Sequence, residues 1–463
     1  MLSLNAKVGI WGLGVVGNSL ARYLVKAGCA NLLIYDKKIT PESLSDLHLP
    51  IVVQTLTDLE RFLSGCDYII PSPGIDLTNY RAYKHKFITE LDFFFDHWRK
   101  PIVGITGTLG KTTLTTQLTE LLQKMGLNAV AGGNIEPAMC DLLDGSGQLA
   151  VLELSSFQLE HARYFAPDLA IWTNFYPNHL DRHQTMAAYY GAKLKILSYQ
   201  TAAQKALVPF ELLLELPAVE VQLFGFSLQV PASIPINCQG VFYLYDQQIR
   251  LRTCANDQLI MELSQLQIGT HQINLVILGA VIYLQGLQSR FNALAPIAIN
   301  AQIEHRLEKF HTFNQIDFYN DSKSTVAQAT LAAVRRLRLN SSVRPVILIL
   351  GGLGKGVDRE ALVAELAGQV RLIISFEAEA KQLEQYCQKY QISSLACVDL
   401  PSVIRALKDR ACSDDQVLFS PAGASFDLFV NYIARGHEFK QQVVNNWPVD
   451  IEFGTALGLE ESR

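Results

Sequence analysis

The segment from residue 101 to residue 113, PIVGITGTLGKTT, constrains this chain more than any other part of the sequence. A short β-branched run leads into a glycine-rich turn, and a run of good helix formers follows. Gly104, Gly107 and Gly110 let the backbone bend so that its N–H groups can face an anion. The N-terminus of the following helix adds the positive end of its dipole. The pattern therefore predicts a strand, a loop and a helix that together bind phosphate.

Two side chains at the start of the predicted helix indicate what the loop binds. Lys111 can reach the outer phosphates of a nucleotide, and the hydroxyl of Thr112 can ligate magnesium. The spacing departs from the strict phosphate-loop pattern because Ile105 stands where the first glycine belongs. A glycine-rich turn can also be a plain connection, but Lys-Thr directly after the last glycine favours a site for a nucleoside triphosphate.

Composition excludes several classes of protein. The chain has 463 residues and a formal net charge of −5, which predicts two to four globular domains and argues against nucleic-acid binding. The longest apolar run, 275–284, is too short to span a membrane, and the glycine-rich N-terminus does not resemble a signal peptide. Eight cysteines without a C-x-x-C pair predict reduced thiols. We expect a cytoplasmic monomer without membrane insertion.

A second glycine-rich turn lies near the N-terminus. The motif GLGVVG at 12–17 follows a short apolar run, and the strand-like run 31–35 ends in Asp36. This is the dinucleotide-binding pattern, which is weak evidence when it stands alone. A third run, 67–70, leads into the turn PSPGI at 71–75. These segments predict a parallel sheet with a ligand at the C-terminal ends of its strands.

Strand-like runs alternate with helical or glycine-rich segments through the rest of the chain, which predicts parallel sheets covered by helices. Between 205 and 270 short alternating strands suggest an antiparallel edge or insertion. The other runs lie at 128–131, 149–154, 168–173, 317–319, 346–350, 372–375 and 417–420. We expect an α/β fold of three domains: Rossmann-like at 1–97, P-loop ATPase-like at 98–300 and Rossmann-like at 301–463.

Five residues of the middle block carry candidate chemistry. Glu153 ends an apolar strand, a position that suits Mg²⁺ beside a phosphate loop, and Ser155 follows it closely. Asn134 follows a pair of glycines and can bind phosphate or a carbonyl group. His179 lies in the polar turn NHLDRH, where the clustering of polar residues favours a functional role. Lys193, from its pattern alone, is typical of the lysine of an ordinary amphipathic helix.

The last block carries three polar, glycine-rich loops, each directly after a predicted strand. They are NDSKST at 320–325, GGLGKGVD at 351–358 and SPAGASF at 420–426. Strand ends of a parallel sheet meet at one edge, so the three loops predict a composite binding surface there.

Taken together, these motifs resemble the Mur ligases over essentially the full chain. The ATP loop at 104–112, Gly133-Asn134, the segment ELSSFQL at 153–159 and the tripeptide His179-Leu-Asp181 are similar to the family's motifs. The ending at 418–426, with Arg435-Gly436 and Phe439 beyond it, resembles the D-glutamate-adding members more than their siblings.

The resemblance implies an ATP-dependent amide ligase of peptidoglycan precursor synthesis. It would add D-glutamate to UDP-N-acetylmuramoyl-L-alanine through an acyl phosphate, with Mg²⁺ as cofactor. Lys111, His179 and Lys193 would be catalytic, Lys193 as a carbamate that bridges metal ions.

The resemblance also assigns binding roles. For ATP they fall to Gly107, Thr108, Gly110, Lys111, Thr112, Thr113, Arg306 and Asp321. For the UDP substrate they fall to Asp36, Ser72, Gly74, Asn134, Ser155 and His179. For D-glutamate they fall to Lys323, Thr325, Lys355, Ser425 and Tyr432, and for metal to Thr112, Glu153, His179 and the carbamylated Lys193.

Several positions depart from the family pattern. Leu109 stands where the ATP loop usually has Asn, Gln272 and Leu275 replace asparagines near the adenine, and Lys37-Lys38 replaces a Thr-Arg pair. The alternatives are therefore a sibling Mur ligase, a folylpolyglutamate-type synthetase, and a nucleotide-binding homologue with weakened catalysis. A dinucleotide-dependent oxidoreductase leaves the second and third blocks unexplained.

Overall fold

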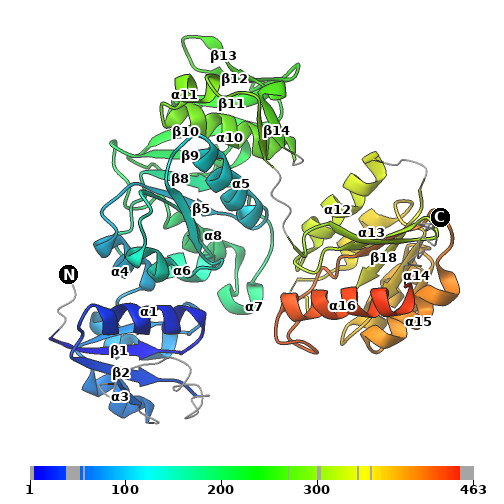
Figure 1. Ribbon diagram of the computed structural model, residues 1–463, viewed down its shortest axis with the longest axis horizontal. Coiled ribbons are helices and arrows are strands. Elements are labelled where there is room, and N and C mark those ends of the chain that lie inside the picture. The colour runs from blue at the N-terminus through cyan, green and yellow to red at the C-terminus, as the bar shows by residue number, and fades with distance from the viewer. Residues whose placement is uncertain are drawn as a thin grey trace, which may run out of the picture. The chain divides into compact units, whose positions relative to one another are not determined.

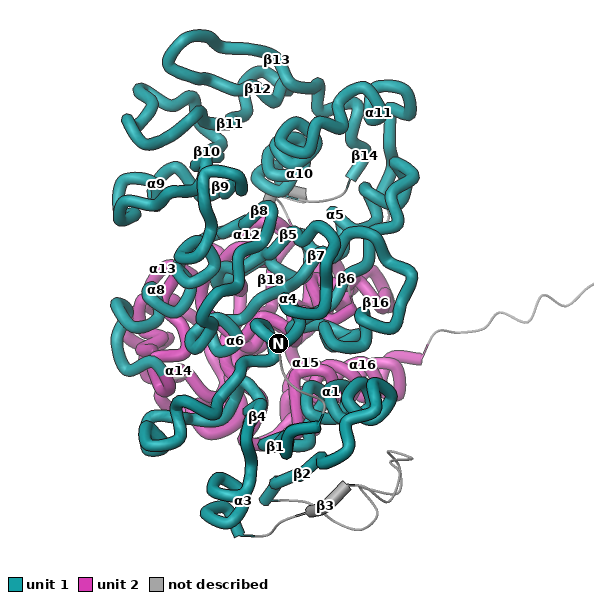
Figure 2. The backbone as a smooth tube through the Cα atoms, turned by 90° about the vertical axis from the view of Figure 1, so that its left-hand side faces the viewer, with its two compact units in different colours: residues 1–175, 183–301 teal, residues 176–182, 302–463 magenta. Residues whose placement is uncertain are grey.

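The computed structural model describes residues 5–37, 53–55, 58–268, 271–299, 304–340, 344–354 and 357–448. Contacts group the chain into two compact units, which Figure 2 colours separately: residues 1–175 with 183–301, and residues 176–182 with 302–463. Both units are mainly parallel sheets flanked by helices (Figure 1), so the predicted α/β class is confirmed. The boundaries at 97/98 and 300/301 stay predictions.

The first unit begins with a four-stranded parallel sheet in the order β3-β2-β1-β4. In both β1 and β2 four of the five residues are buried, as expected of parallel strands that are covered on both faces. The elements are β1 Lys7–Trp11, α1 Val15–Lys26, β2 Asn31–Tyr35, β3 Val53–Thr55, α3 Leu59–Gly65, β4 Tyr68–Pro71, η1 Thr78–Lys86 and α4 Glu90–His97.

The same unit contains a nine-stranded sheet in the order β13-β12-β11-β10-β9-β8-β5-β7-β6. From β6 to β11 neighbours run parallel, and β12 and β13 add an antiparallel edge. The predicted edge is thus confirmed for β11 to β13, whereas β9 and β10 extend the parallel part. The strands are β5 Ile102–Thr106, β6 Ala129–Gly133, β7 Leu149–Glu153, β8 Leu169–Trp172, β9 Lys205–Pro209, β10 Gln222–Ser227, β11 Gly240–Tyr245, β12 Gln248–Arg252 and β13 Asp257–Glu262.

Helices of this part follow their strands closely. The most apolar of the described helices is α10, which comes between β14 and β15 in the chain. The strands β14 Leu266–Ile268 and β15 Ile297–Ile299 pair in parallel. The helical elements are α5 Lys111–Lys124, η2 Met139–Asp144, α6 Ser156–Glu160, α8 Met186–Leu194, α9 Phe210–Leu213, η3 Leu263–Gln265, α10 Gln272–Leu284 and α11 Gln288–Asn292. The short helix α7 Leu180–His183 comes between α6 and α8 in the chain, and its first three residues belong to the second unit.

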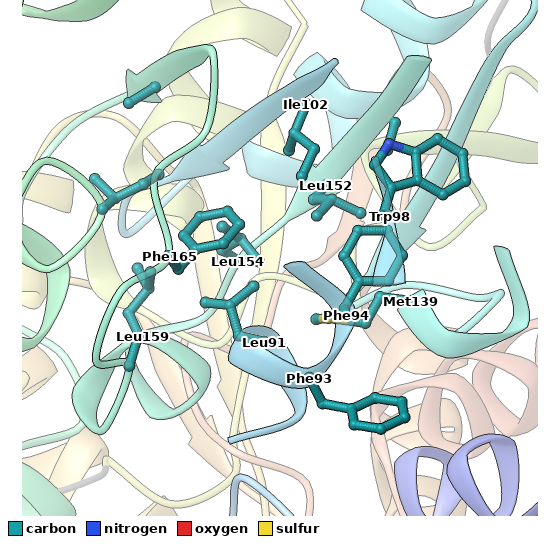
Figure 3. Close-up of a cluster of buried hydrophobic side chains, with 14 of the residues drawn as sticks. Leu91, Phe93, Phe94, Trp98, Ile102, Met139, Leu152, Leu154, Leu159 and Phe165 are labelled. Carbon is teal, nitrogen blue, oxygen red and sulfur yellow. The ribbon is translucent and has the colours of Figure 1, made fainter. Parts of the chain in front are cut away.

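A hydrophobic cluster joins α4 to the nine-stranded sheet (Figure 3). Phe94 on α4 and Trp98 directly after it stack with ring centroids 5.5 Å apart, and Leu152 of β7 lies in the same cluster. Each fully buried large apolar side chain contributes about 1.5–3 kcal/mol. This cluster fixes α4 against the strands that carry the candidate site.

The second unit holds a six-stranded sheet in the order β16-β17-β21-β18-β19-β20, in which only β16 is antiparallel to its neighbour. Because β17, β21, β18 and β19 are parallel neighbours, their C-terminal ends meet at one edge. The elements are β16 Glu308–Phe313, β17 Ile316–Asn320, α12 Ala327–Asn340, β18 Val346–Leu350, α13 Glu360–Leu366, β19 Leu372–Ser375, α14 Ala380–Lys389, β20 Ser394–Ala396, α15 Leu400–Arg410, β21 Gln416–Phe419 and α16 Tyr432–Asn446.

Cysteine chemistry agrees with the sequence. All eight cysteines are free thiols, and five of them are buried. Among the helices that the structure describes, none is both long and apolar enough to cross a membrane.

Candidate functional site

The glycine-rich loop runs from the end of β5 to the start of α5. Gly107 has φ +144°, and a Cβ there would come within 2.0 Å of the Thr173 hydroxyl oxygen. Gly110 caps α5 with φ +78°, so both positions need glycine. Gly104 does not belong to the turn, contrary to the prediction. It lies inside β5, where a Cβ would come within 3.3 Å of side-chain carbons of Leu154 and Pro167. Its role is therefore to allow close packing.

Two residues after β8 hold the loop in place. The side chain of Asn174 accepts from the backbone N–H of Leu109 at 2.8 Å and donates to its carbonyl at 3.0 Å. Thr173 donates to the same carbonyl at 2.7 Å. These contacts use only the backbone of Leu109, so its unusual side chain leaves the loop's hydrogen bonds unchanged. No role was predicted for either residue, although Thr173 ends the predicted strand 168–173 and Asn174 directly follows it.

Lys111 folds back over the loop that it follows. Its ammonium donates to the carbonyl oxygens of Gly107 at 3.0 Å and Thr108 at 3.2 Å. A phosphate oxygen would offer a stronger, charge-assisted acceptor at the same place. The geometry therefore suits a lysine that turns from backbone carbonyls to a bound phosphate.

Glu153 is the centre of a small polar cluster at the end of β7. It is 2% exposed, and its carboxylate accepts from the Thr112 hydroxyl at 2.6 Å and from the Asn134 side chain at 2.9 Å. The three predicted residues are thus brought together from α5, β7 and the end of β6. A carboxylate and a hydroxyl provide the oxygen donors that Mg²⁺ prefers, so these residues fit a magnesium site beside the phosphate loop.

Lys193 on α8 is buried, with 1% of its surface exposed. The interpretation from the helix pattern alone, an ordinary lysine of an amphipathic helix, was wrong, because α8 turns this side chain into the protein. Its amine donates to the Gly107 carbonyl at 2.8 Å. Burial and the charge of Lys111 lower the pKa of Lys193 well below its ordinary value, and the opposing charge of Glu153 only partly compensates. This shift favours the neutral form of the amine over the charged one.

The N-terminal glycine turn is held by two of the predicted UDP-binding residues. The Asp36 carboxylate accepts from the Leu13 N–H at 2.7 Å, and the Ser72 hydroxyl donates to the Gly12 carbonyl at 3.1 Å. A Cβ on Gly17 would lie 1.9 Å from the same carbonyl, which explains the need for glycine. Both Asp36 and Ser72 therefore shape the turn. Gly74 is exposed, and Lys38 falls outside the described residues.

Ser155 and His179 make their hydrogen bonds with neighbours in the sequence and not with the cluster at Glu153. Ser155 caps α6: its hydroxyl accepts from the Gln158 N–H at 3.3 Å, and the Gln158 side chain accepts from the N–H of Ser155 at 3.0 Å. His179 has φ +56°, and its backbone N–H donates to the Asn178 side chain. It belongs to the segment 176–182 of the second unit. Its role as a metal ligand stays a prediction.

In the second unit, the charge of Arg306 acts on Asp321, and the ATP contact of these two residues stays a prediction. Asp321 is 3% exposed and accepts from the Leu307 N–H at 3.0 Å and the Ser420 hydroxyl at 2.7 Å. Burial raises the pKa of Asp321, and the charge of Arg306 opposes that rise. The Nε atom of Arg306 is buried and has no hydrogen-bond partner among the described residues.

Four of the predicted D-glutamate residues lie at or near the C-terminal edge of this sheet. The Lys323 ammonium lies 5.3 Å from the centroid of the Tyr432 ring, at the start of α16. Thr325 follows in the same loop, and Ser425 is buried in the loop after β21. Lys355 falls outside the described residues.

An ion pair between buried Arg359 and half-buried Glu379, which fastens the loops at 351–358 and 420–426, was not predicted from the sequence. Arg359, 3% exposed, donates to the carbonyls of Gly351 at 2.8 Å and Gly352 at 2.9 Å, and pairs with Glu379 at 2.5 Å. Glu379 in turn accepts from the Gly354 N–H at 2.7 Å. The signal in the sequence was an arginine directly after the glycine-rich loop, but its partner is distant in the chain.

One further group of residues has the composition of a metal site. The ligand atoms of Glu304, His305 and His437 lie within 4.8 Å of one another. However, Lys440 already pairs with Glu304 at 2.5 Å. The Asn320 amide lies 2.8 Å from Nδ1 of His305 and donates to it, so the proton sits on Nε2, which then cannot bind a metal. We therefore assign no metal to this group.

The chain matches known families along most of its length. Residues 6–85 match the MurD-like N-terminal domain of Mur ligases, residues 105–282 the Mur ligase middle domain, and residues 305–423 the glutamate ligase domain of Mur ligases.

Relatives and solved structures agree with these matches. The UDP-N-acetylmuramoylalanine–D-glutamate ligase of Caldanaerobacter subterraneus is 31% identical over 95% of this chain and 98% of its own. That of Desulfotalea psychrophila is 34% identical over 94% of this chain and 95% of its own. In fold, UDP-N-acetylmuramate-alanine ligase MurC from Thermotoga maritima superposes with a TM-score of 0.59 at 16% identity, covering 95% of this chain and 100% of its own. MurF ligase from the same organism, solved with ADP, has a TM-score of 0.56 at 15% identity, with coverages of 96% and 100%.

Proposed function

Since this chain belongs to the Mur ligase family, we propose that it is an ATP-dependent ligase that joins D-glutamate to UDP-N-acetylmuramoyl-L-alanine in peptidoglycan precursor synthesis. The relatives named for this reaction are matched along almost their whole length. Within the structure, the observation that carries the proposal is the cluster of Thr112, Asn134 and Glu153 beside the phosphate loop.

The first step moves the γ-phosphoryl group of ATP to the terminal carboxylate of the alanyl group. Lys111, the loop N–H groups and the start of α5 would bind the phosphates and stabilise the charge that builds up during transfer. Mg²⁺, held by Glu153 and Thr112, would neutralise the phosphates and polarise the P–O bond. Of the loop residues, Gly107, Thr108, Gly110 and Thr113 would contribute to the same ATP site, with Arg306 and Asp321.

Lys193 would complete the metal site as a carbamate, together with His179. An amine attacks CO₂ only when it is neutral, and the burial of Lys193 favours that form. The reaction adds CO₂ to Nζ and releases one proton, which turns a buried amine into an anionic oxygen ligand.

The second step forms the amide bond. The amine of D-glutamate attacks the carbonyl carbon of the acyl phosphate, loses a proton, and expels inorganic phosphate from the tetrahedral adduct. We propose His179 as the group that accepts the proton. D-glutamate would be held by Lys323, Thr325, Lys355, Ser425 and Tyr432, and the UDP substrate by Asp36, Ser72, Gly74, Asn134, Ser155 and His179.

A substrate-resolved assay tests this function. Purified protein should release phosphate from ATP only when UDP-N-acetylmuramoyl-L-alanine and D-glutamate are both present. Lys111→Ala should lower that rate at least about 100-fold, because one charge-assisted phosphate contact contributes several kcal/mol to the transition state. Equal turnover with L-glutamate or meso-diaminopimelate would contradict the D-glutamate assignment and favour a sibling ligase.

Nucleotide binding without phosphate release under any substrate combination would instead favour a homologue with weakened catalysis.

We also propose that the protein acts as a cytoplasmic monomer of three domains, at 1–97, 98–300 and 301–463.

A further inference from the structure

A cavity of about 500 Å³ lies within the first unit, and of the residues with a role in the proposed reaction only Ser72 lines it. Its walls come from three segments: the end of β4 through η1 to the start of α4, the helix α6 with the residues after it, and the residues after α8. Its volume falls within the range of small-molecule sites in proteins.

The inner wall of this cavity combines apolar surface with one buried acid. Phe87 and Leu91 are buried there, and Phe157 is half-buried. Glu90, at the start of α4, is 2% exposed, and neither of its carboxyl oxygens has a hydrogen-bond partner within 3.5 Å among the described residues, although the Gln158 side chain is near enough to favour its charged form. A buried polar group without a partner costs free energy. A ligand that supplied the missing partner would recover that cost.

The mouth of the cavity is positively charged. Arg81, Lys84 and Arg163 are exposed there, and Lys195 is half-buried. The Arg163 guanidinium donates to the backbone carbonyl of Lys84 at 2.5 Å, which places it beside η1. Four cations, against the half-buried acid Glu160 that also lines the cavity, favour an anionic group on the ligand.

The cavity differs from the proposed substrate site. Of the residues proposed to contact the UDP substrate, only Ser72 lines it, and the phosphate loop and Glu153 contribute nothing to its walls. Ser72 holds the Gly12 carbonyl, and Gln158, also in the wall, holds Ser155. The cavity therefore lies behind residues that shape the substrate site.

We propose that this cavity is a second ligand site that binds an amphipathic aromatic anion, with the anionic group at the cationic mouth and a hydrogen-bonding group at Glu90. The apolar walls cover the body of such a molecule. Its contacts with Ser72 and Gln158 connect occupancy of this site to the two turns that those side chains hold.

Fluorescence titration of the full chain with anilinonaphthalene sulfonate, an amphipathic aromatic anion, tests the proposal. Wild-type protein should bind about one equivalent saturably. The double variant Arg81→Ala/Lys195→Ala should bind at least about fivefold more weakly, because it loses half of the cations at the mouth. Lys381→Ala/Arg405→Ala removes two exposed cations of the second unit and should leave the affinity unchanged.

A second variant guards against misfolding. Thr78 is exposed on η1 and lines the cavity, so Thr78→Trp narrows it from the solvent side without changing the core. Its melting temperature should match that of the wild type while probe binding is lost. Absence of saturable binding in the wild type would overturn the proposal. So would a probe affinity in Thr78→Trp and in Arg81→Ala/Lys195→Ala that equals that of the wild type. Displacement of the probe by UDP-N-acetylmuramoyl-L-alanine would also overturn it, by showing that the cavity belongs to the substrate site.

Discussion

At the scale of single residues, the carbonyl oxygen of Gly107 joins the two lysines of the candidate site. It accepts from Lys111 at 3.0 Å and from Lys193 at 2.8 Å. Lys111 was predictable, since it follows the glycine turn directly. The burial of Lys193 was not, because the amphipathic pattern of α8 does not specify which face turns toward the phosphate loop. The resemblance, rather than the helix pattern, pointed to this lysine.

We expect Lys193→Met to separate activity from stability. The variant should lose at least about 100-fold in kcat, because no carbamate can form. It should also melt at a higher temperature than the wild type, since a buried amine is replaced by an apolar side chain of similar length. Steady-state assays and calorimetry measure the two effects. Lys195→Met, two residues on, is the control and should keep kcat, whereas full activity of Lys193→Met would exclude the carbamate.

At the scale of elements, most strands could be predicted within one or two residues, because parallel strands are short apolar runs bounded by turns. The run at 417–420 appears as β21 Gln416–Phe419, for example. The edge strands β16 and β20 were missed, because β16 (EKFHTF) has only two apolar residues, three positions apart, and β20 has three residues. The three strand ends that carry the predicted D-glutamate loops could thus be placed. The Arg359–Glu379 ion pair that fastens two of these loops could not be predicted.

The Arg359–Glu379 pair should act through the loops that it fastens. Arg359→Ala removes the contacts to Gly351 and Gly352, so we expect the KM for D-glutamate to rise at least about tenfold while the KM for ATP changes little. Arg359→Lys should restore part of the effect. Arg335→Ala, which breaks an exposed pair with Glu365, serves as the control. Equal increases in both KM values would show general unfolding of the unit instead of loop positioning.

At the scale of the whole molecule, the α/β class and the order of the three blocks could be predicted because glycine turns and strand runs repeat along the chain. The grouping of residues 1–175 with 183–301 could not, since it depends on side-chain packing such as that between α1 and η2. Arg22 of α1, for instance, pairs with Asp141 at 2.8 Å across this packing. No local pattern specifies such a partner.

The buried Glu90 predicts how stability depends on pH. Burial raises the pKa of Glu90 from 4.5 to about 8, the charge of Asp141 adds to the rise, and the Gln158 side chain opposes it. The folded state therefore holds the proton more tightly than the unfolded state, and stability from this group falls as the pH rises from about 4.5 to 8. Glu90→Gln should gain on the order of 2–4 kcal/mol over the wild type between pH 5 and pH 8.

Urea unfolding of both proteins at the two pH values measures this difference. Glu438→Gln, at an exposed position of α16, is the control and should follow the wild type. A constant difference between Glu90→Gln and the wild type across the pH range would show that Glu90 is charged in the folded state.

The most direct test of the central claim is a competition experiment. The protein is incubated with ATP, Mg²⁺ and UDP-N-acetylmuramoyl-L-alanine in an equimolar mixture of D-glutamate, L-glutamate, L-alanine and meso-diaminopimelate. Chiral analysis and mass spectrometry of the product identify the amino acid that was added. The account predicts that only D-glutamate is incorporated, with one phosphate released for each amide bond. Incorporation of another amino acid, or phosphate release without a new amide bond, would contradict it.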